Sequence, residues 1–303
     1  MDPEEELQYK LEKIGSVFDI EKIIIDKTNK DRPSEFKRVG SLPYSLLRKG
    51  IKQFFTTEEA HITDVMRCED FVERYLEDGV KTVLEVTIRY RDESFDLAAK
   101  YPDVHFFSWI LSGSDVQHEL ERMRGIPNLK SDLRSVEDIH NHNVDSLDLS
   151  YSIESLSLCQ NQTDIIKDVF SNLRKEGRFV VVDQYLHQQF GPLSKHHLWL
   201  KHLVGRSVAL SDLESYDLFK DRVTRQGMRV EFEGDLTDAV IPESEKVSEY
   251  AGTFFNRGIV AKAASSLLPD DFAYRIISAY LMPTAMRLGM ATYRVTVFKK
   301  DME

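Results

Sequence analysis

Cysteine is scarce in this 303-residue sequence, in which Cys68 and Cys159 are the two present. They are too few and too far apart for a disulfide framework or a cysteine-based zinc site. We therefore expect no bound metal. The same scarcity indicates a reducing compartment, and a cytoplasmic location is expected.

A long apolar run and an excess of positive charge are missing as well. The sequence has no run of about 18 apolar residues, and the acidic N-terminus MDPEEELQYKLEKIG does not have the basic and then apolar pattern of a signal peptide. We expect no membrane span and no export. The formal net charge is −11, from 40 basic and 51 acidic residues, which argues against nucleic acid as a partner. Small molecules or other proteins are the expected partners.

The residues that are present favour an α/β fold. Hydrophobic residues make up 42% and charged residues 30%, which is enough apolar material for a sizeable core. In the first 80 residues, apolar positions recur at helical spacing in segments 7–18, 43–55 and 64–79. Short apolar runs typical of strands follow, and they alternate with polar or helical stretches: KTVLEVTI, DVHFFSWIL, SLDLSYSI, GRFVVVDQYL, RVEFEGDL and TYRVTVFKK. This alternation predicts a mostly parallel sheet with crossover helices.

The order of these patterns predicts one domain with appendages. We expect a helical N-terminal cap over residues 1–80 and an α/β domain over residues 81–303. The segment between the last two predicted strands has helical spacing. We expect it to form a helical lid over about residues 247–290.

One segment carries a family resemblance. Residues 146–186, SLDLSYSIESLSLCQNQTDIIKDVFSNLRKEGRFVVVDQYL, resemble the fourth strand, the following helix and the fifth strand of class I S-adenosylmethionine (SAM) methyltransferases of the ubiquinone/menaquinone, sterol and phosphoethanolamine type. The resemblance implies a Rossmann-like, doubly wound, mostly parallel seven-stranded sheet. In it, Gly177 ends the helix and Asp183 ends a buried central strand at the crevice where doubly wound folds bind ligands.

The cofactor loop departs from the family pattern. In the family, the first strand runs into an acidic residue and then a G-x-G-x-G turn that lets the backbone approach SAM. The resemblance places Glu85 at the acidic position and Thr87, Arg89 and Arg91 at the three glycine positions. Side chains there would fill the space of the methionine moiety. The alternative is that the strand register is shifted and a working loop lies elsewhere.

Two further cofactor contacts are expected from the same resemblance. The acidic residue that holds the ribose at the end of the second strand is replaced by Ile110, and Ser112 is a nearby substitute. An acidic residue near the adenine falls in segment 131–141, where Asp138 is a candidate. If SAM binds, we expect Glu85, Ser112 and Asp138 to contact it. Arg89 and Arg91 have two open interpretations, an anion site or surface arginines paired with neighbouring acids.

Candidate catalytic residues lie at the ends of the fourth and fifth predicted strands. The resemblance places the acceptor substrate there, and it points to Glu154, Tyr185 and His187. Histidine transfers protons near neutral pH, so His187 is the first candidate for a general acid or base. A structural or surface role is the alternative for this residue and for His196, His197 and His202.

Three functions fit this sequence. The first two are enzymes of small-molecule metabolism acting on a lipidic, prenyl or polyketide-like substrate: an unusual SAM-dependent methyltransferase, or a non-methylating enzyme such as a cyclase. The third is an inactive methyltransferase homologue that binds and supports an active methyltransferase chain. Aromatic and methionine residues in the predicted lid suit a hydrophobic substrate pocket, although helical spacing also explains them as core. A homodimer is compatible with all three.

Overall fold

The computed structural model describes residues 1–25, 68–76, 79–87, 93–110, 125–133, 146–159, 161–187, 193–205, 214–265 and 270–301. The chain divides into two compact units. The first, called the helical unit, comprises Met1–Val65, Gln189–Val208 and Asp238–Ala291. The second, called the sheet unit, comprises Met66–Gln188, Ala209–Thr237 and Thr292–Glu303.

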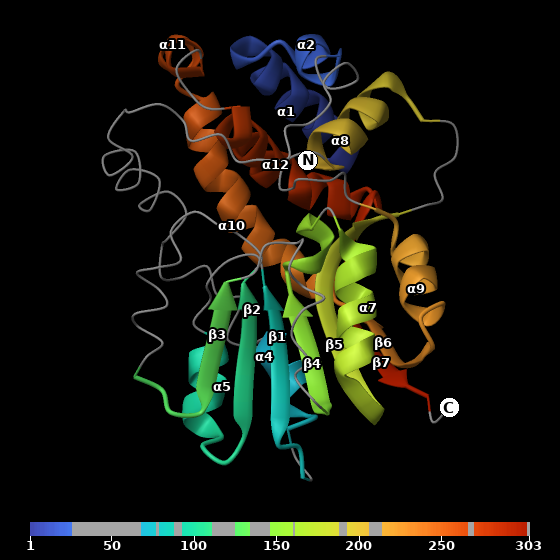
Figure 1. Ribbon diagram of the computed structural model, residues 1–303. Coiled ribbons are helices and arrows are strands. Elements are labelled where there is room, and N and C mark those ends of the chain that lie inside the picture. The colour runs from blue at the N-terminus through green and yellow to red at the C-terminus, as the bar shows by residue number, and fades with distance from the viewer. Residues whose placement is uncertain are drawn as a thin grey trace. The chain divides into compact units, whose positions relative to one another are not determined.

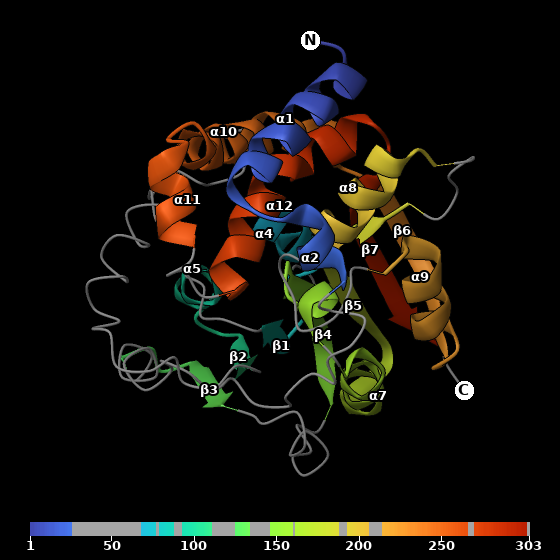
Figure 2. The same ribbon diagram turned by 90° about the horizontal axis from the view of Figure 1, so that it is seen from above.

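The helical unit is built around two helices from opposite ends of the sequence. Its described helices are α1 (Pro3–Val17), α2 (Ile20–Ile25), α8 (Lys195–Gly205), α10 (Thr237–Phe255), α11 (Ile259–Ser265) and α12 (Asp270–Arg287). Helix α1 lies across α12, and α8 packs against α12 as well (Figure 2). The α1 helix begins at an Asp2 cap, whose carboxylate accepts a hydrogen bond from the Glu4 N–H at 3.2 Å. The N-terminal cap predicted for residues 1–80 and the lid predicted for about residues 247–290 stay predictions.

A buried charge network joins α1 to α10 and α12 within the helical unit. The Lys10 ammonium is 2.8 Å from the Glu6 carboxylate and donates hydrogen bonds to Ser248 Oγ and the Tyr280 carbonyl at 2.9 and 2.8 Å. Glu6 is also paired with Arg287 of α12 at 2.8 Å. Because a buried charge is tolerated when it is paired and hydrogen-bonded, these contacts let Lys10 occupy the apolar face of α1.

The sheet unit contains a seven-stranded sheet within its described residues (Figure 1). Its strands are β1 (Thr82–Thr87), β2 (His105–Ile110), β3 (Leu129–Leu133), β4 (Leu147–Ile153), β5 (Leu173–Leu186), β6 (Met228–Asp235) and β7 (Ala291–Lys300). They lie in the order β3-β2-β1-β4-β5-β7-β6. The pairs β3-β2, β2-β1, β1-β4 and β4-β5 are parallel, and β6 and β7 are antiparallel. The predicted Rossmann-like, mostly parallel sheet is confirmed.

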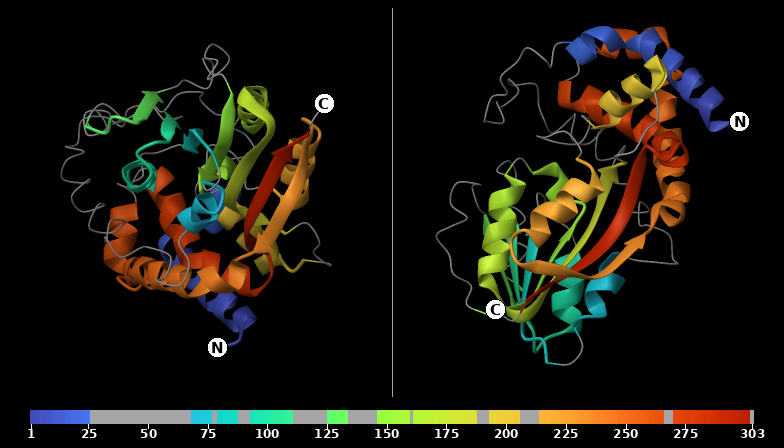
Figure 3. Two further views of the ribbon diagram at one scale, coloured as in Figure 1. Left: turned by 90° about the horizontal axis from the view of Figure 1, so that it is seen from below. Right: turned by 90° about the vertical axis from the view of Figure 1, so that its right-hand side faces the viewer.

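Helices cover both faces of this sheet, as the edge-on view in Figure 3 shows. Helices α7 (Gln162–Asn172) and α9 (Tyr216–Thr224) lie on one face, and α4 (Cys68–Glu73) and α5 (Glu93–Lys100) on the other. Alternation along β1 sends Leu84 and Val86 into the core under α7 and α9. Val83, Glu85 and Thr87 therefore project to the opposite face.

The six apolar runs named in the sequence all became strands, and the pattern missed one further strand, β3. Strand β3 has the sequence LKSDL, which lacks an apolar run and gave no strand signal; its pairing with β2 makes it a strand. The predicted helix at 43–55 lies outside the described residues. Among the described residues, every helix is too short or too polar to cross a bilayer.

The expected role of Gly177 is wrong. Helix α7 ends at Asn172, and Gly177 lies inside β5. A Cβ at this position would be 2.8 Å from the Arg174 carbonyl oxygen and 3.1 Å from the Leu147 carbonyl oxygen. Since real Cβ atoms do not approach that closely, Gly177 is required for the close passage of backbone where β5 meets β4.

Candidate active site

The strand order reverses between β1 and β4, because β2 and β3 lie on one side of this pair and β5, β7 and β6 on the other. In doubly wound folds, ligands bind at such a switch point, beyond the carboxyl ends of the strands. We call the carboxyl ends of strands β1, β2, β4 and β5, together with the segments that follow them, the carboxyl edge of the sheet unit. Two groups of polar residues lie there, one at β1 and β2 and the other at β4, β5 and β7.

Glu85 belongs to the first group. It is 4% exposed, and its register partner on β2 is Ser108, whose hydroxyl donates a 2.7 Å hydrogen bond to Glu85 Oε2. Both residues lie in the interior of their strands. The Glu85 carboxylate is therefore held by a neighbouring strand. Sequence reasoning did not identify Ser108, since a serine in an apolar strand carries no functional signal until its register partner is known.

Thr87 and Ile110, which the family resemblance places at two of the expected cofactor-contact positions, are direct neighbours. They end β1 and β2 and are register partners, and they are 2% and 0% exposed. The Thr87 hydroxyl is 3.3 Å from Ser155 Oγ, which in turn donates to the Ile153 carbonyl at 2.9 Å. The end of β1 is thus tied to the segment that follows β4.

Asp183 is the centre of the second group. It is fully buried in β5 and accepts hydrogen bonds from the Ser157 N–H at 2.8 Å, the Ser157 hydroxyl at 2.6 Å and the Gln184 N–H at 2.9 Å. Burial raises the pKa of the Asp183 carboxyl to about 6, against the lowering effect of these donors. A carboxyl that titrates near neutral pH can exchange a proton under physiological conditions.

Glu154 follows β4 directly and has a backbone conformation that is rare for residues other than glycine. Its φ is +44°, and its N–H donates to the Val182 carbonyl at 2.8 Å. Its carboxylate accepts a 2.9 Å hydrogen bond from the Tyr293 hydroxyl of β7. Left-handed backbone in a non-glycine residue is strained and concentrates at functional sites. Glu154 is partly exposed, so its carboxylate can reach a ligand.

The structure separates the other two catalytic candidates. Tyr185 is 2% exposed and packs its ring against Tyr216 and Phe219, at centroid distances of 5.4 and 5.0 Å. Burial raises the pKa of the Tyr185 hydroxyl well above its usual range. His187 is exposed just beyond β5. The predicted trio of Glu154, Tyr185 and His187 therefore occupies three different environments, and its catalytic role stays a prediction.

Four of the predicted site residues are not described by the structure, and one further residue of the site was not predicted. Ser112, Asp138, Arg89 and Arg91 lie outside the described residues. Sequence reasoning missed Tyr293, because only the strand order brings β7 beside β5 and the hydroxyl to Glu154. In the described part of the chain, no group of three or more histidine, cysteine, aspartate or glutamate side chains could hold a metal ion.

No protein-family model matches this chain. No curated protein sequence matches it either.

Solved structures do match. Geranyl diphosphate C-methyltransferase from Streptomyces coelicolor A3(2), solved with Mg2+, geranyl diphosphate and S-adenosyl-L-homocysteine, is 15% identical; the match covers 93% of this chain and 98% of that chain with a TM-score of 0.57. A cyclopropane synthase from Mycobacterium tuberculosis is 12% identical, with coverages of 95% and 98% and a TM-score of 0.57. The (4+2)-cyclase SpnF is 12% identical, with coverages of 78% and 81% and a TM-score of 0.55. Such identities establish the fold and leave the activity open: the chain has the fold of the class I SAM-dependent methyltransferases.

Proposed function

We propose that this chain is an enzyme of small-molecule metabolism that acts on a lipidic, prenyl or polyketide-like substrate at the carboxyl edge of the sheet unit, in a reaction without methyl transfer from SAM, such as a cyclisation. The observation that carries the proposal is the pairing of Thr87 with Ile110. Both positions that should contact the cofactor hold buried side chains, side by side.

These two residues do not fit SAM bound in the usual way. Thr87 stands where a glycine would let the backbone approach the methionine end of SAM, and its hydroxyl is engaged with Ser155. Ile110 offers no acceptor for the ribose hydroxyls, and leaving hydroxyls without partners on binding costs about 1–3 kcal/mol each. The carboxyl edge also carries two acidic residues, Glu154 after β4 and Asp183 in β5.

Those acidic groups suit acid-base chemistry on a bound substrate. Glu154 is partly exposed, and the hydrogen bond from the Tyr293 hydroxyl fixes the orientation of its carboxylate, which can act as a general base. Asp183 interacts electrostatically with Glu154, whose negative charge contributes to the raised pKa of the Asp183 carboxyl. A cyclisation joins atoms of one substrate, and orientation in a shaped site accelerates such a step without a cofactor. The similarity to the (4+2)-cyclase SpnF supports this choice.

Calorimetric titration with SAM and with S-adenosylhomocysteine tests the proposal. We expect no heat of binding for either compound up to millimolar concentration. The S. coelicolor geranyl diphosphate methyltransferase, titrated in the same buffer, is the positive control, because its structure contains S-adenosyl-L-homocysteine. Binding of either compound to this chain would overturn the non-methylating assignment.

The second candidate is an unusual methyltransferase, and Glu85 favours it. This residue keeps the acidic position of the first strand. If SAM does bind, Glu85→Ala should abolish binding; retained binding would show that the first strand is misplaced in the resemblance. A pull-down that recovers a methyltransferase chain with an intact G-x-G-x-G loop would instead favour the inactive partner.

A further inference from the structure

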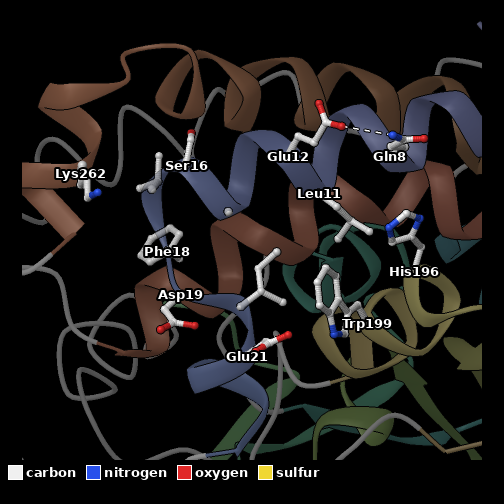
Figure 4. Close-up of a pocket in the computed structure, with 13 residues that line it drawn as sticks. Gln8, Leu11, Glu12, Ser16, Phe18, Asp19, Glu21, His196, Trp199 and Lys262 are labelled. Carbon is white, nitrogen blue, oxygen red and sulfur yellow. Dashed lines mark hydrogen bonds between the residues drawn. The ribbon is translucent and has the colours of Figure 1, made fainter.

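A groove in the helical unit lies outside the site at the carboxyl edge. It has a volume of about 600 Å³ and is formed by α1, α2, α8 and α11 (Figure 4). That volume is within the range of about 300–1,000 Å³ found for small-molecule sites. The described residues that line it all belong to the helical unit: Gln8, Leu11, Glu12, Gly15, Ser16, Val17, Phe18, Asp19, Ile20, Glu21, His196, Trp199 and Lys262.

The floor of this groove is apolar. Leu11, Val17 and Ile20 are 3%, 5% and 7% exposed, and they come from α1 and α2. Two half-buried aromatic side chains, Phe18 and Trp199, also line it. Figure 4 shows the Trp199 indole and the Leu11 side chain projecting from facing helices. A ligand with an apolar body can therefore contact both aliphatic and aromatic surface here.

The rim of the groove is acidic. Glu12, Asp19 and Glu21 contribute three carboxylates among the described lining residues, and Lys262 contributes one ammonium. All three acidic residues are exposed. Because Lys195 also pairs with Glu21, the described rim carries three carboxylates and two ammonium groups, a small excess of negative charge that favours cations over anions.

A contact within the protein shows that this rim accommodates an ammonium group. The Lys195 ammonium of α8 lies over the Trp199 ring at 4.4 Å from its centroid and is paired with Glu21 at 3.0 Å. Trp199 and Glu21 both line the groove. An alkylammonium is therefore already held between an indole face and a carboxylate, which is the arrangement that recognises organic cations.

From the apolar floor, the acidic rim and this internal contact, we propose that the groove is a binding site for an organic cation with an apolar body, such as an alkylammonium compound. The indole face of Trp199 and the carboxylate of Glu21 receive the cationic group, and Leu11, Val17 and Ile20 receive the apolar body. Lys195 competes with the ligand for Trp199 and Glu21. This site is independent of the reaction proposed at the carboxyl edge.

The test is calorimetric titration of the full chain with octyltrimethylammonium, compared with octyl sulfate, which has the same chain length and the opposite charge. We expect the cation to bind at least about tenfold more tightly than the anion. Tryptophan fluorescence locates the binding, because Trp199 is half-buried in the groove while Trp109, the other tryptophan, is 1% exposed in β2. Equal affinities for the two amphiphiles, or no binding of the cation, would overturn the proposal.

Two sets of variants identify the residues. Trp199→Leu and Glu21→Gln should each weaken octyltrimethylammonium binding by about tenfold. Lys195→Met removes the competing ammonium and should strengthen binding several-fold, whereas Lys201→Met on the same helix should leave it unchanged. Unchanged or weaker binding in Lys195→Met would contradict the assignment even if Trp199→Leu failed to fold. SAM binding or catalysis enters none of these readouts, so a failure here is separate from a failure of the proposed reaction.

Discussion

The two units of this protein bury charge in different ways. In the helical unit, the Lys10 ammonium is neutralised by Glu6, which is itself paired with Arg287. In the sheet unit, Glu85 and Asp183 accept hydrogen bonds from the hydroxyls of Ser108 and Ser157. An ion pair balances the charge it buries, whereas a hydroxyl stabilises a carboxylate without removing its charge.

The two kinds of burial leave different groups free to exchange protons. The Lys10 network connects α1 with α10 and α12. Its role is structural, because the ammonium group holds three helices together. The Asp183 carboxyl, held by neutral donors, has its pKa raised to about 6 by burial. A carboxyl group that titrates near neutral pH can take part in proton transfer. The sheet unit is therefore the part of the chain that favours acid-base catalysis.

Removing the buried cation should have the largest effect. Lys10→Met leaves Glu6 and Thr284 without the ammonium that they contact at 2.8 and 3.1 Å. Breaking a buried ion pair from one side costs about 3–5 kcal/mol. Since Arg287 still pairs with Glu6, we expect the free energy of unfolding to fall by about 3 kcal/mol, the lower end of that range. Urea denaturation measures it. Lys13→Met on the same helix is the matched control and should change stability by less than about 0.5 kcal/mol; equal effects would refute the structural role of the pair.

The pH dependence of stability should reveal Asp183. Its pKa in the folded protein, about 6, is above the ordinary value of 3.8, so the folded state binds the proton more tightly. The resulting stabilisation is fully present below about pH 4 and is lost as the pH rises to about 6. Between pH 4 and 7 the wild type should lose about 2 kcal/mol relative to Asp183→Asn, which does not titrate. Parallel pH profiles for the two proteins would mean that Asp183 keeps an ordinary pKa.

Removing the hydroxyl that holds Glu85 should have the smallest effect. Ser108→Ala deletes the donor at 2.7 Å from a carboxylate that is 4% exposed. We expect a loss of about 1–2 kcal/mol in the free energy of unfolding, from the weaker solvation of the buried charge. Ser171→Ala, which deletes an exposed hydroxyl on α7, is the control and should be neutral. A neutral Ser108→Ala would show that Glu85 does not depend on its register partner.

Much of the fold could be predicted because it depends on local apolar patterns. Strand β5 contains the apolar run FVVV, and every position of β4 is buried although apolar and polar residues alternate along it. The resemblance of residues 146–186 placed both strands correctly. The apolar pattern gave no prediction, or a wrong one, where a segment is held by backbone contacts and not by apolar side chains. LKSDL became β3 through its pairing with β2, and Gly177, interpreted as a helix end, became a close backbone contact inside β5.

The candidate site could be predicted only in part. Glu154 and Ile110 were placed at strand ends, and the structure confirms that Glu154 follows β4 and that Ile110 ends β2. Asp183 was also placed at the end of its strand, but β5 continues to Leu186, so that placement is wrong. The partners of these residues were not visible. Tyr293 reaches Glu154 from β7, and Ser108 reaches Glu85 from β2. Register and strand order decide such pairs, and neither is written in the residues of a single strand.

The class of fold followed from the sequence, since it depends on local apolar patterns in residues 82–110 and 146–186. The tertiary structure alone decided that Thr87 and Ile110 are neighbours, that Glu154 accepts the Tyr293 hydroxyl, and that α1, α2, α8 and α11 line one groove. The physical reason is that these relations join segments far apart in the chain. Backbone hydrogen bonding between strands and the burial of apolar helix faces bring them together.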